Sequence, residues 1–172
     1  GVQVLSFDRL AERILSLAGR TKPFLDRQGL AMIVRRAAYR SAGELSAFSA
    51  VARQPGFAGQ IADLIARFKG EGIAPGALEQ AAERLGRDTL LVEKLRDLAI
   101  LYRETDAYLA ERYITAEDAL NIAVSLFPSS FASDLPVYVD GFEGAKRAVY
   151  ALTKAMFTHC PSVAIALRVD AE

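Results

Sequence analysis

Residues 135–169, LPVYVDGFEGAKRAVYALTKAMFTHCPSVAIALRV, decide the fold class of this chain. Two short segments rich in β-branched residues flank a stretch with the apolar spacing of a helix. The β-prone segments are 137–139 and 163–169, and the stretch between them carries Val149, Leu152 and Met156. A strand, a helix and a second strand in this order form a parallel pair, because the helix returns the chain to the end of the sheet where the first strand began. The stretch therefore predicts an α/β layer.

The rest of the chain adds one β-prone segment and many helices. Residues 2–7 are expected to form a third strand, and residues 21–130 show almost only helical periodicity. We therefore expect an α/β chain that is predominantly helical. A small parallel sheet lies in a discontinuous layer, residues 1–20 and 131–172, into which a helical subdomain of residues 21–130 is inserted.

Residue patterns also set the expected ends of the helices. Asp8 is the expected N-cap of the first helix, and Thr115 with Asp118 forms a capping-box pattern that opens a later one. The longest helix is expected at residues 88–112, where apolar residues recur at spacings of three and four. Its seam consists of Leu91, Leu95, Leu98, Tyr102, Thr105 and Leu109. Such a seam is expected to be buried against another helix, or to dock a partner protein.

Composition excludes several classes of protein. Apolar residues make up 52% of the chain and charged residues 24%, which is typical of a folded domain rather than a disordered one. No apolar run reaches the roughly 20 residues of a membrane span, and we expect a cytoplasmic protein that does not contact a membrane. Cys160 and His159 are the only cysteine and histidine, so neither an intrachain disulfide nor a usual four-ligand zinc site can form. Cys160 is interpreted as a partly buried thiol, with a nucleophile activated by His159 as the alternative.

Charge is distributed unevenly along a chain that is neutral overall. Residues 1–42 carry an excess of five positive charges, which the remaining residues balance. The eight basic residues of this segment are Arg9, Arg13, Arg20, Lys22, Arg27, Arg35, Arg36 and Arg40. Such an asymmetry is typical of a surface that faces an anion, although arginines on the solvated faces of helices give the same pattern.

Four stretches resemble one known family. They are VLSFDRLAERIL at 4–15, LIARFKGEGIAP at 64–75, LRDLAILYRETDAYLAERYITAEDAL at 95–120, and VYVDGF at 137–142. In this order they resemble the B subunit of bacterial ATP-dependent helicase/deoxyribonuclease complexes, the AddB type, which is built on a superfamily 1 helicase scaffold. The fourth stretch is similar to the family's Walker B strand. The resemblance implies that the small sheet is part of a RecA-like helicase domain.

The resemblance also implies partners and cofactors for a longer parent protein. The partners are DNA, as a single strand or a duplex end, and the A subunit of the same heterodimer. Mg²⁺, ATP and an iron–sulfur cluster are implied for the parent, whereas no cofactor is expected in this segment. No G-x-x-x-x-G-K-[ST] loop occurs in the 172 residues. We expect the phosphate loop to precede Gly1 and the nuclease to follow Glu172.

Asp140 ends the β-prone segment at the place where nucleotide hydrolases often hold Mg²⁺. Hydrolysis also needs a second carboxylate for the attacking water, and Gly141 follows instead. Asp140 is therefore interpreted as the remnant of a nucleotide and Mg²⁺ site. The alternative is that Asp140 caps a helix that begins near Glu143, because aspartate is a strong N-cap residue.

The candidate DNA contacts begin at the first turn. Ser6 and Arg9 offer a hydroxyl and a guanidinium to phosphate, and Phe7 offers a ring for stacking. In the family that the chain resembles, the matching segment touches single-stranded DNA. The alternative is that Phe7 lies in the core and Arg9 is only solvated. Further candidate phosphate contacts are Arg35, Arg36, Arg67 and Lys69.

Three functions are consistent with the sequence. The first is a non-catalytic part of the B subunit of a helicase/deoxyribonuclease that contacts DNA and docks a partner subunit during double-strand break repair. The second is a helical adaptor that binds another protein through its long helix. The third is a small metal-dependent hydrolase that uses Asp140, Glu143 and His159.

The chain itself is predicted not to hydrolyse ATP, and Gly141→Glu is predicted not to restore hydrolysis. A lone carboxylate binds Mg²⁺ weakly without substrate phosphates, and no glycine-rich loop of this chain holds those phosphates. Steady-state phosphate release with Mg²⁺ and ATP measures this for the native chain, Gly141→Glu and Asp140→Ala. Turnover that disappears in Asp140→Ala would show that the chain is a working ATPase.

Overall fold

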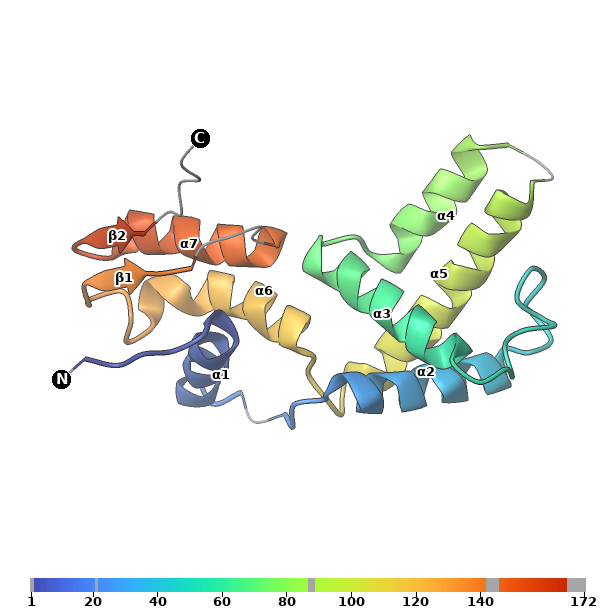
Figure 1. Cartoon of the computed structure of the whole chain (residues 1–172), viewed down its shortest axis with the longest axis horizontal. Coiled ribbons are helices and arrows are strands. Elements are labelled where there is room, and N and C mark those ends of the chain that lie inside the picture. The colour runs from blue at the N-terminus through green and yellow to red at the C-terminus, as the bar shows by residue number, and fades with distance from the viewer. Residues whose placement is uncertain (1, 21, 87–88, 142–145, 167–172) are drawn as a thin grey trace, which may run out of the picture. The chain divides into compact units, whose positions relative to one another are not determined.

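The computed structural model describes residues 2–20, 22–86, 89–141 and 146–166. Within these ranges the chain is mostly helical, with two short strands (Figure 1). In chain order the elements are α1 (Phe7–Leu17), α2 (Arg27–Arg40), α3 (Phe57–Gly70), α4 (Pro75–Arg84), α5 (Leu90–Leu109), α6 (Ala116–Leu126), the 3-10 helix η1 (Phe127–Ser129), β1 (Val137–Val139), α7 (Arg147–His159) and β2 (Val163–Ile165). None of the described helices is long and apolar enough to cross a membrane.

The chain divides into two compact units. The first contains residues 1–21 and 116–172, and the second, which we call the helical unit, contains residues 22–115 with α2 to α5. The predicted insert of 21–130 extends beyond the helical unit, because α6 packs on α1 and α7 of the first unit.

The first unit holds the sheet. Strands β1 and β2 are parallel, with Val137 opposite Val163, which confirms the strand, helix and strand order predicted from the sequence. The pairing is closed at one end by the Val137 N–H, which donates to the Ser162 carbonyl at 3.0 Å. Apolar side chains of α7 and η1, Leu152 and Phe127, are fully buried in the same unit. The mostly helical α/β class is thus confirmed, while a RecA-like domain stays a prediction.

The strand predicted at residues 2–7 is wrong. Residues 2–6 belong to no strand, and Val2 and Val4 are more than 90% exposed. Ser6, rather than Asp8, is the N-cap of α1, and its hydroxyl oxygen accepts from the Arg9 N–H at 3.2 Å. β-Branched residues favour a strand only where a neighbouring strand takes up the backbone hydrogen bonds. Because the described sheet consists of β1 and β2, residues 2–6 have no such neighbour.

The last predicted strand and the longest predicted helix are shorter than the patterns suggested. Strand β2 ends at Ile165, and residues 167–169 lie outside the described part of the chain. Helix α5 ends at Leu109 instead of residue 112, and residue 88 is not described. Helix α6 begins directly after Thr115, as the capping-box pattern predicted.

Helix α5 runs through the core of the helical unit and packs on α2 and α4. The predicted seam is buried from Leu98 to Leu109, whereas Leu91 is 54% exposed. Because most of the seam is used inside the unit, it is not free to dock a partner protein. Thr105 is also fully buried in the seam, and its hydroxyl has no hydrogen-bond partner among the described residues.

One buried carboxylate joins α5 to the segment between α2 and α3. Asp97 is 1% exposed, and both of its oxygens accept the Ser46 N–H at 3.1 Å. One of them also accepts the Phe48 N–H at 2.8 Å. The spacing of apolar residues along α5 does not predict this contact, because a charged residue on a helix is expected to face solvent. A buried carboxylate is stable only when hydrogen bonds replace its lost hydration, and backbone N–H groups do so here.

Asp97→Ala is predicted to lower the free energy of unfolding by about 2–3 kcal/mol, because it removes a buried acceptor and leaves two backbone donors without it. Asp97→Asn keeps the size and one acceptor oxygen, so its loss is predicted to be smaller. Urea unfolding followed by circular dichroism measures both, with Arg96→Ala, an exposed neighbour on α5, as the control. Equal stability of Asp97→Ala and the control would contradict the structural role of this carboxylate.

Candidate nucleic-acid interface

Three of the candidate DNA contacts lie at the start of α1 in the first unit. Arg9 is exposed, and its guanidinium donates to the Glu12 carboxylate at 3.1 Å. The Ser6 hydroxyl accepts the cap hydrogen bond but keeps its own O–H to donate. Phe7 is half-buried, so one part of the ring remains open to solvent. This turn therefore presents a hydroxyl, a cation and part of an aromatic ring together.

The other four candidates lie in the helical unit, and the structure separates them. Arg35 and Arg36 are exposed on α2, and Arg67 is exposed on α3. Lys69 is only 7% exposed, and its ammonium donates to the Asp106 carboxylate. The same ammonium lies 5.7 Å from the centre of the Tyr102 ring. Lys69 is thus held inside the unit, and we leave it out of the candidate interface.

Helices α2 and α5 and the turn after α5 line a half-open cavity of about 260 Å³ with a basic lining, which we call the arginine cavity. Its lining residues are Ile33, Arg36, Ala37, Arg40, Glu104, Ala107, Tyr108 and Arg112. The guanidinium carbon of Arg36 lies 4.4 Å from the centre of the Tyr108 ring, and that of Arg112 lies 4.6 Å from it. Both distances are typical of cation–π contacts. The cavity therefore gathers three positive charges and one negative charge around an aromatic ring.

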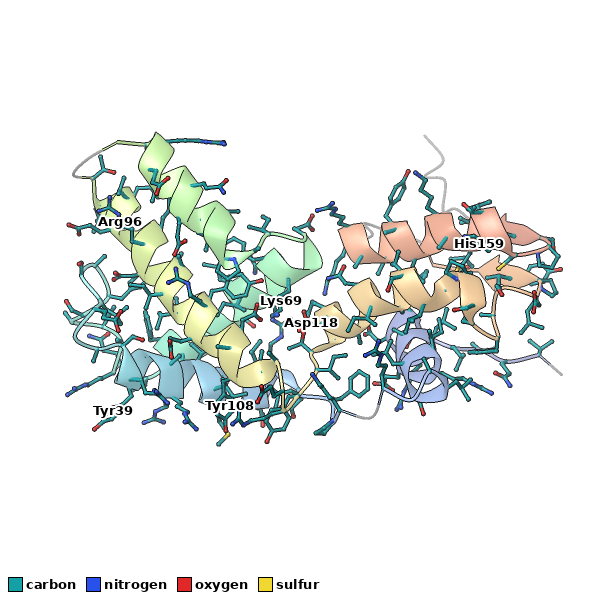
Figure 2. All side chains as sticks on the ribbon, turned by 180° about the vertical axis from the view of Figure 1, so that it is seen from behind. Tyr39, Lys69, Arg96, Tyr108, Asp118 and His159 are labelled. Atoms are coloured by element: carbon teal, nitrogen blue, oxygen red, sulfur yellow. The ribbon has the colours of Figure 1, made fainter. Side chains whose placement is uncertain are left out.

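A second aromatic ring is exposed on α2, on a residue next in sequence to one that lines the cavity. Tyr39 is 74% exposed, and the guanidinium of Arg53 lies 6.0 Å from the centre of its ring. Tyr39 is adjacent in sequence to Arg40, a cavity residue, and lies three residues after Arg36. Figure 2 labels Tyr39 at one end of α2 and Tyr108, on α5, toward the other end of α2. Exposed rings between arginines are typical of surfaces that bind single-stranded nucleic acid.

Sequence reasoning identified Arg36 but missed Arg40, Tyr108 and Arg112 as members of one site. Arg36 and Arg40 are four residues apart on one helix, and this spacing alone could have paired them. Tyr108 comes from the last turn of α5 and Arg112 from the turn that follows it, and only the packing of α2 on α5 brings them to the same place as Arg36 and Arg40.

Asp140 follows β1 and is exposed. Gly141, which comes next, has a φ of +69°, a left-handed conformation that favours glycine. The N-cap of α7, the next described helix, is Lys146 rather than Asp140, and the start of a helix near Glu143 lies outside the described residues. Among the described residues, no group of three histidine, cysteine or carboxylate side chains could hold a metal ion. Glu143 lies outside the described residues.

Cys160 has the surroundings of a structural thiol. Its Sγ donates to the Ala132 carbonyl oxygen at 3.4 Å, and burial raises the pKa of the thiol above its ordinary value. The negative charge of Asp134 raises this pKa further. A raised pKa leaves less thiolate at neutral pH, and the thiolate is the nucleophile. His159, the last residue of α7, is exposed.

Comparison with known proteins gives a family match over the whole chain. The family described as ADDB, N-terminal, matches residues 1–172. The chain belongs to this family. The match agrees with the resemblance carried by the SFDRLA and VYVDGF stretches, residues 6–11 and 137–142.

Curated relatives of this family member share one name, which describes the B subunit of an ATP-dependent helicase/deoxyribonuclease. The protein of this name from Moorella thermoacetica is 37% identical over 98% of the chain. Those from Desulforudis audaxviator and Anoxybacillus flavithermus are 36% and 32% identical, each also over 98% of the chain. The chain spans 15% of the length of each of these relatives.

Lys69→Met is predicted to lower stability and to leave the binding of single-stranded DNA unchanged. Methionine fills a similar space without the charge, so the Asp106 carboxylate loses its ion pair. Asp106 is 40% exposed, and water can partly replace that partner, so we expect a loss of about 1–2 kcal/mol. Thermal unfolding measures the stability, and fluorescence anisotropy with labelled oligothymidine measures the binding. Weaker DNA binding by a variant that remains folded would return Lys69 to the interface.

Proposed function

We propose that the chain is the N-terminal part of the B subunit of an ATP-dependent helicase/deoxyribonuclease, and that it contributes DNA contact and docking of a partner subunit rather than catalysis. The observation that carries this proposal is the family match over residues 1–172, together with relatives that share one name. In the proposed complex the protein acts in the cytoplasm, on DNA ends in double-strand break repair and recombination.

The proposed DNA contact is supported by the charge and exposure of two regions. The start of α1 presents Ser6, Phe7 and Arg9, and the helical unit presents exposed arginines beside aromatic rings. Arginine side chains bind phosphate through paired N–H groups, and they release counterions from DNA as they do so. The positive excess of residues 1–42 places most of this charge near the beginning of the sequence.

The proposed docking to an A subunit is supported by aromatic side chains that the first unit leaves uncovered. Tyr138 on β1 is 81% exposed, and Tyr150 and Phe157 on α7 are both more than half exposed. Exposed aromatic residues are enriched at protein interfaces. The heterodimer itself is part of the proposal.

Catalysis is assigned in this proposal to other parts of the parent protein and to its partner. The 172 residues contain no glycine-rich phosphate loop with its lysine. ATP, Mg²⁺ and an iron–sulfur cluster accordingly belong, in this proposal, to regions outside this chain. Asp140 is the one residue here that we relate to a former nucleotide site.

The test of the DNA contact is the binding of labelled oligothymidine to the 172-residue chain over a range of salt concentrations. Binding is expected to be weak, and Arg9→Ala is expected to weaken it further. For Arg9→Ala, the slope of log affinity against log salt concentration should be smaller in magnitude by about 0.7, because one phosphate contact is lost. Lys154→Ala removes an exposed cation from α7 of the same unit and serves as the matched control.

Two results would contradict the proposal in different ways. An affinity for DNA that does not depend on salt, or no binding at all, would contradict DNA contact by this chain. Equal binding by Arg9→Ala and Lys154→Ala would remove the start of α1 from the DNA path and leave the rest of the proposal in place.

A further inference from the structure

We propose that the arginine cavity between α2 and α5 binds one backbone phosphate of single-stranded DNA. Arg36, Arg40 and Arg112 supply the positive charge, and Tyr39 stacks on a neighbouring base. This inference rests on the proposed DNA contact and adds to it a defined site in the helical unit.

Like charges gather around one ring of the cavity. The guanidinium carbons of Arg36 and Arg112 lie 4.4 Å and 4.6 Å from the centre of the same Tyr108 ring. The distance between the two carbons is therefore no greater than the sum of these two values. No carboxylate of the described residues forms an ion pair with either group or with Arg40. Repulsion between such cations is relieved when an anion binds within reach of both. The cavity is therefore arranged for a negatively charged ligand.

Tyr108 restricts the orientation of the guanidinium groups that contact it. A ring in contact with two guanidinium groups restricts the directions in which they can turn, so less rotational freedom is lost when they bind. Guanidinium groups present their N–H donors as a planar fork that matches two phosphate oxygens. Tyr108 itself is already covered by Arg36 and Arg112, so its expected role is to position them rather than to stack on a base.

Glu104 also lines the cavity. Its carboxylate opposes any anion that enters, and it lowers the charge of the lining from three positive charges to two. The lining thus retains an excess over the single negative charge of one phosphodiester. This arrangement makes a test with opposite signs possible: removing an arginine weakens binding, whereas neutralising Glu104 strengthens it.

An exposed ring beside the cavity residues in sequence favours single-stranded DNA over other polyanions. Tyr39 is 74% exposed, lies beside Arg53 and is adjacent in sequence to the cavity residue Arg40, so we assign it to stacking on a base next to the bound phosphate. A single strand offers the flat faces of its bases to such a ring, whereas a duplex keeps them stacked inside. An acidic peptide offers carboxylates to the arginines, but it brings no comparable ring to Tyr39.

The experiment measures the affinity of the 172-residue chain for labelled oligothymidine by fluorescence anisotropy. Arg36→Ala and Arg112→Ala are each expected to bind roughly five- to tenfold more weakly and with a shallower salt dependence. Glu104→Gln is expected to bind more tightly than the native chain. Tyr39→Ala is expected to bind more weakly with an unchanged salt dependence, because it removes stacking and no charge.

The matched control is Arg96→Ala. Arg96 is exposed on α5, and it lies twelve positions, or about 18 Å along the helix axis, before Tyr108 (Figure 2). This variant is expected to bind DNA like the native chain. Thermal unfolding followed by circular dichroism verifies that every variant is folded. If Arg36→Ala is not folded, Arg36→Lys is used in its place. Lysine keeps the charge but not the fork, so Arg36→Lys should bind more weakly than the native chain with an unchanged salt dependence.

Four results would overturn the inference. If the chain binds DNA and Arg36→Ala and Arg112→Ala bind like Arg96→Ala, the cavity is not on the DNA path, while the proposed function stands. If Glu104→Gln weakens binding, the site does not respond to charge as an anion site must. If polyglutamate displaces oligothymidine at equal charge concentration, the cavity fits an acidic peptide instead. No binding of DNA by the native chain would contradict the proposed function as well.

Discussion

The carboxylate of Asp97 is the contact on which the geometry of the helical unit depends. A charge at this depth has lost nearly all of its water, so the backbone donors of Ser46 and Phe48 must take the place of that water. Those donors belong to the segment between α2 and α3. One side chain of α5 thereby holds the segment that connects α2 to α3. Hydrogen bonds are directional, so they restrict the position of this segment more closely than an apolar contact would.

The arginine cavity is a consequence of this arrangement. Tyr108 lies eleven residues after Asp97, about three turns of α5, so the two side chains leave nearly the same side of the helix. Asp97 holds the segment that follows α2, and Tyr108 meets Arg36 on α2 itself. The ring can contact two guanidinium groups only if α2 and α5 keep one separation and one register. A loss of the Asp97 contact is therefore expected to loosen the cavity as well as the core.

Some features of this structure could be predicted from the sequence and others could not, for physical reasons. Helix positions and the parallel pairing of β1 with β2 follow from local periodicity and from the length of the connection, which the sequence displays directly. The segment 2–6 fails as a strand because strand formation depends on a neighbour that periodicity cannot supply. Asp97 and Lys69 could not be recognised as interior residues, because their partners are backbone donors and a carboxylate on other segments. The arginine cavity was missed for the same reason, since its residues are far apart in the chain.

The two candidate DNA-binding regions differ in what binding requires of them. Arg9 already has a partner in Glu12, and a phosphate must compete with that exposed ion pair, which stabilises the protein by no more than about 1 kcal/mol. Arg36 contacts the Tyr108 ring, and Arg112 contacts the same ring and donates to the Tyr108 carbonyl oxygen at 3.4 Å. A ring contact and a phosphate contact can be held at the same time. Ligand binding therefore breaks an interaction at α1, whereas at the cavity it adds one to a preformed arrangement. For equal numbers of charges, the cavity should contribute the larger share of the affinity.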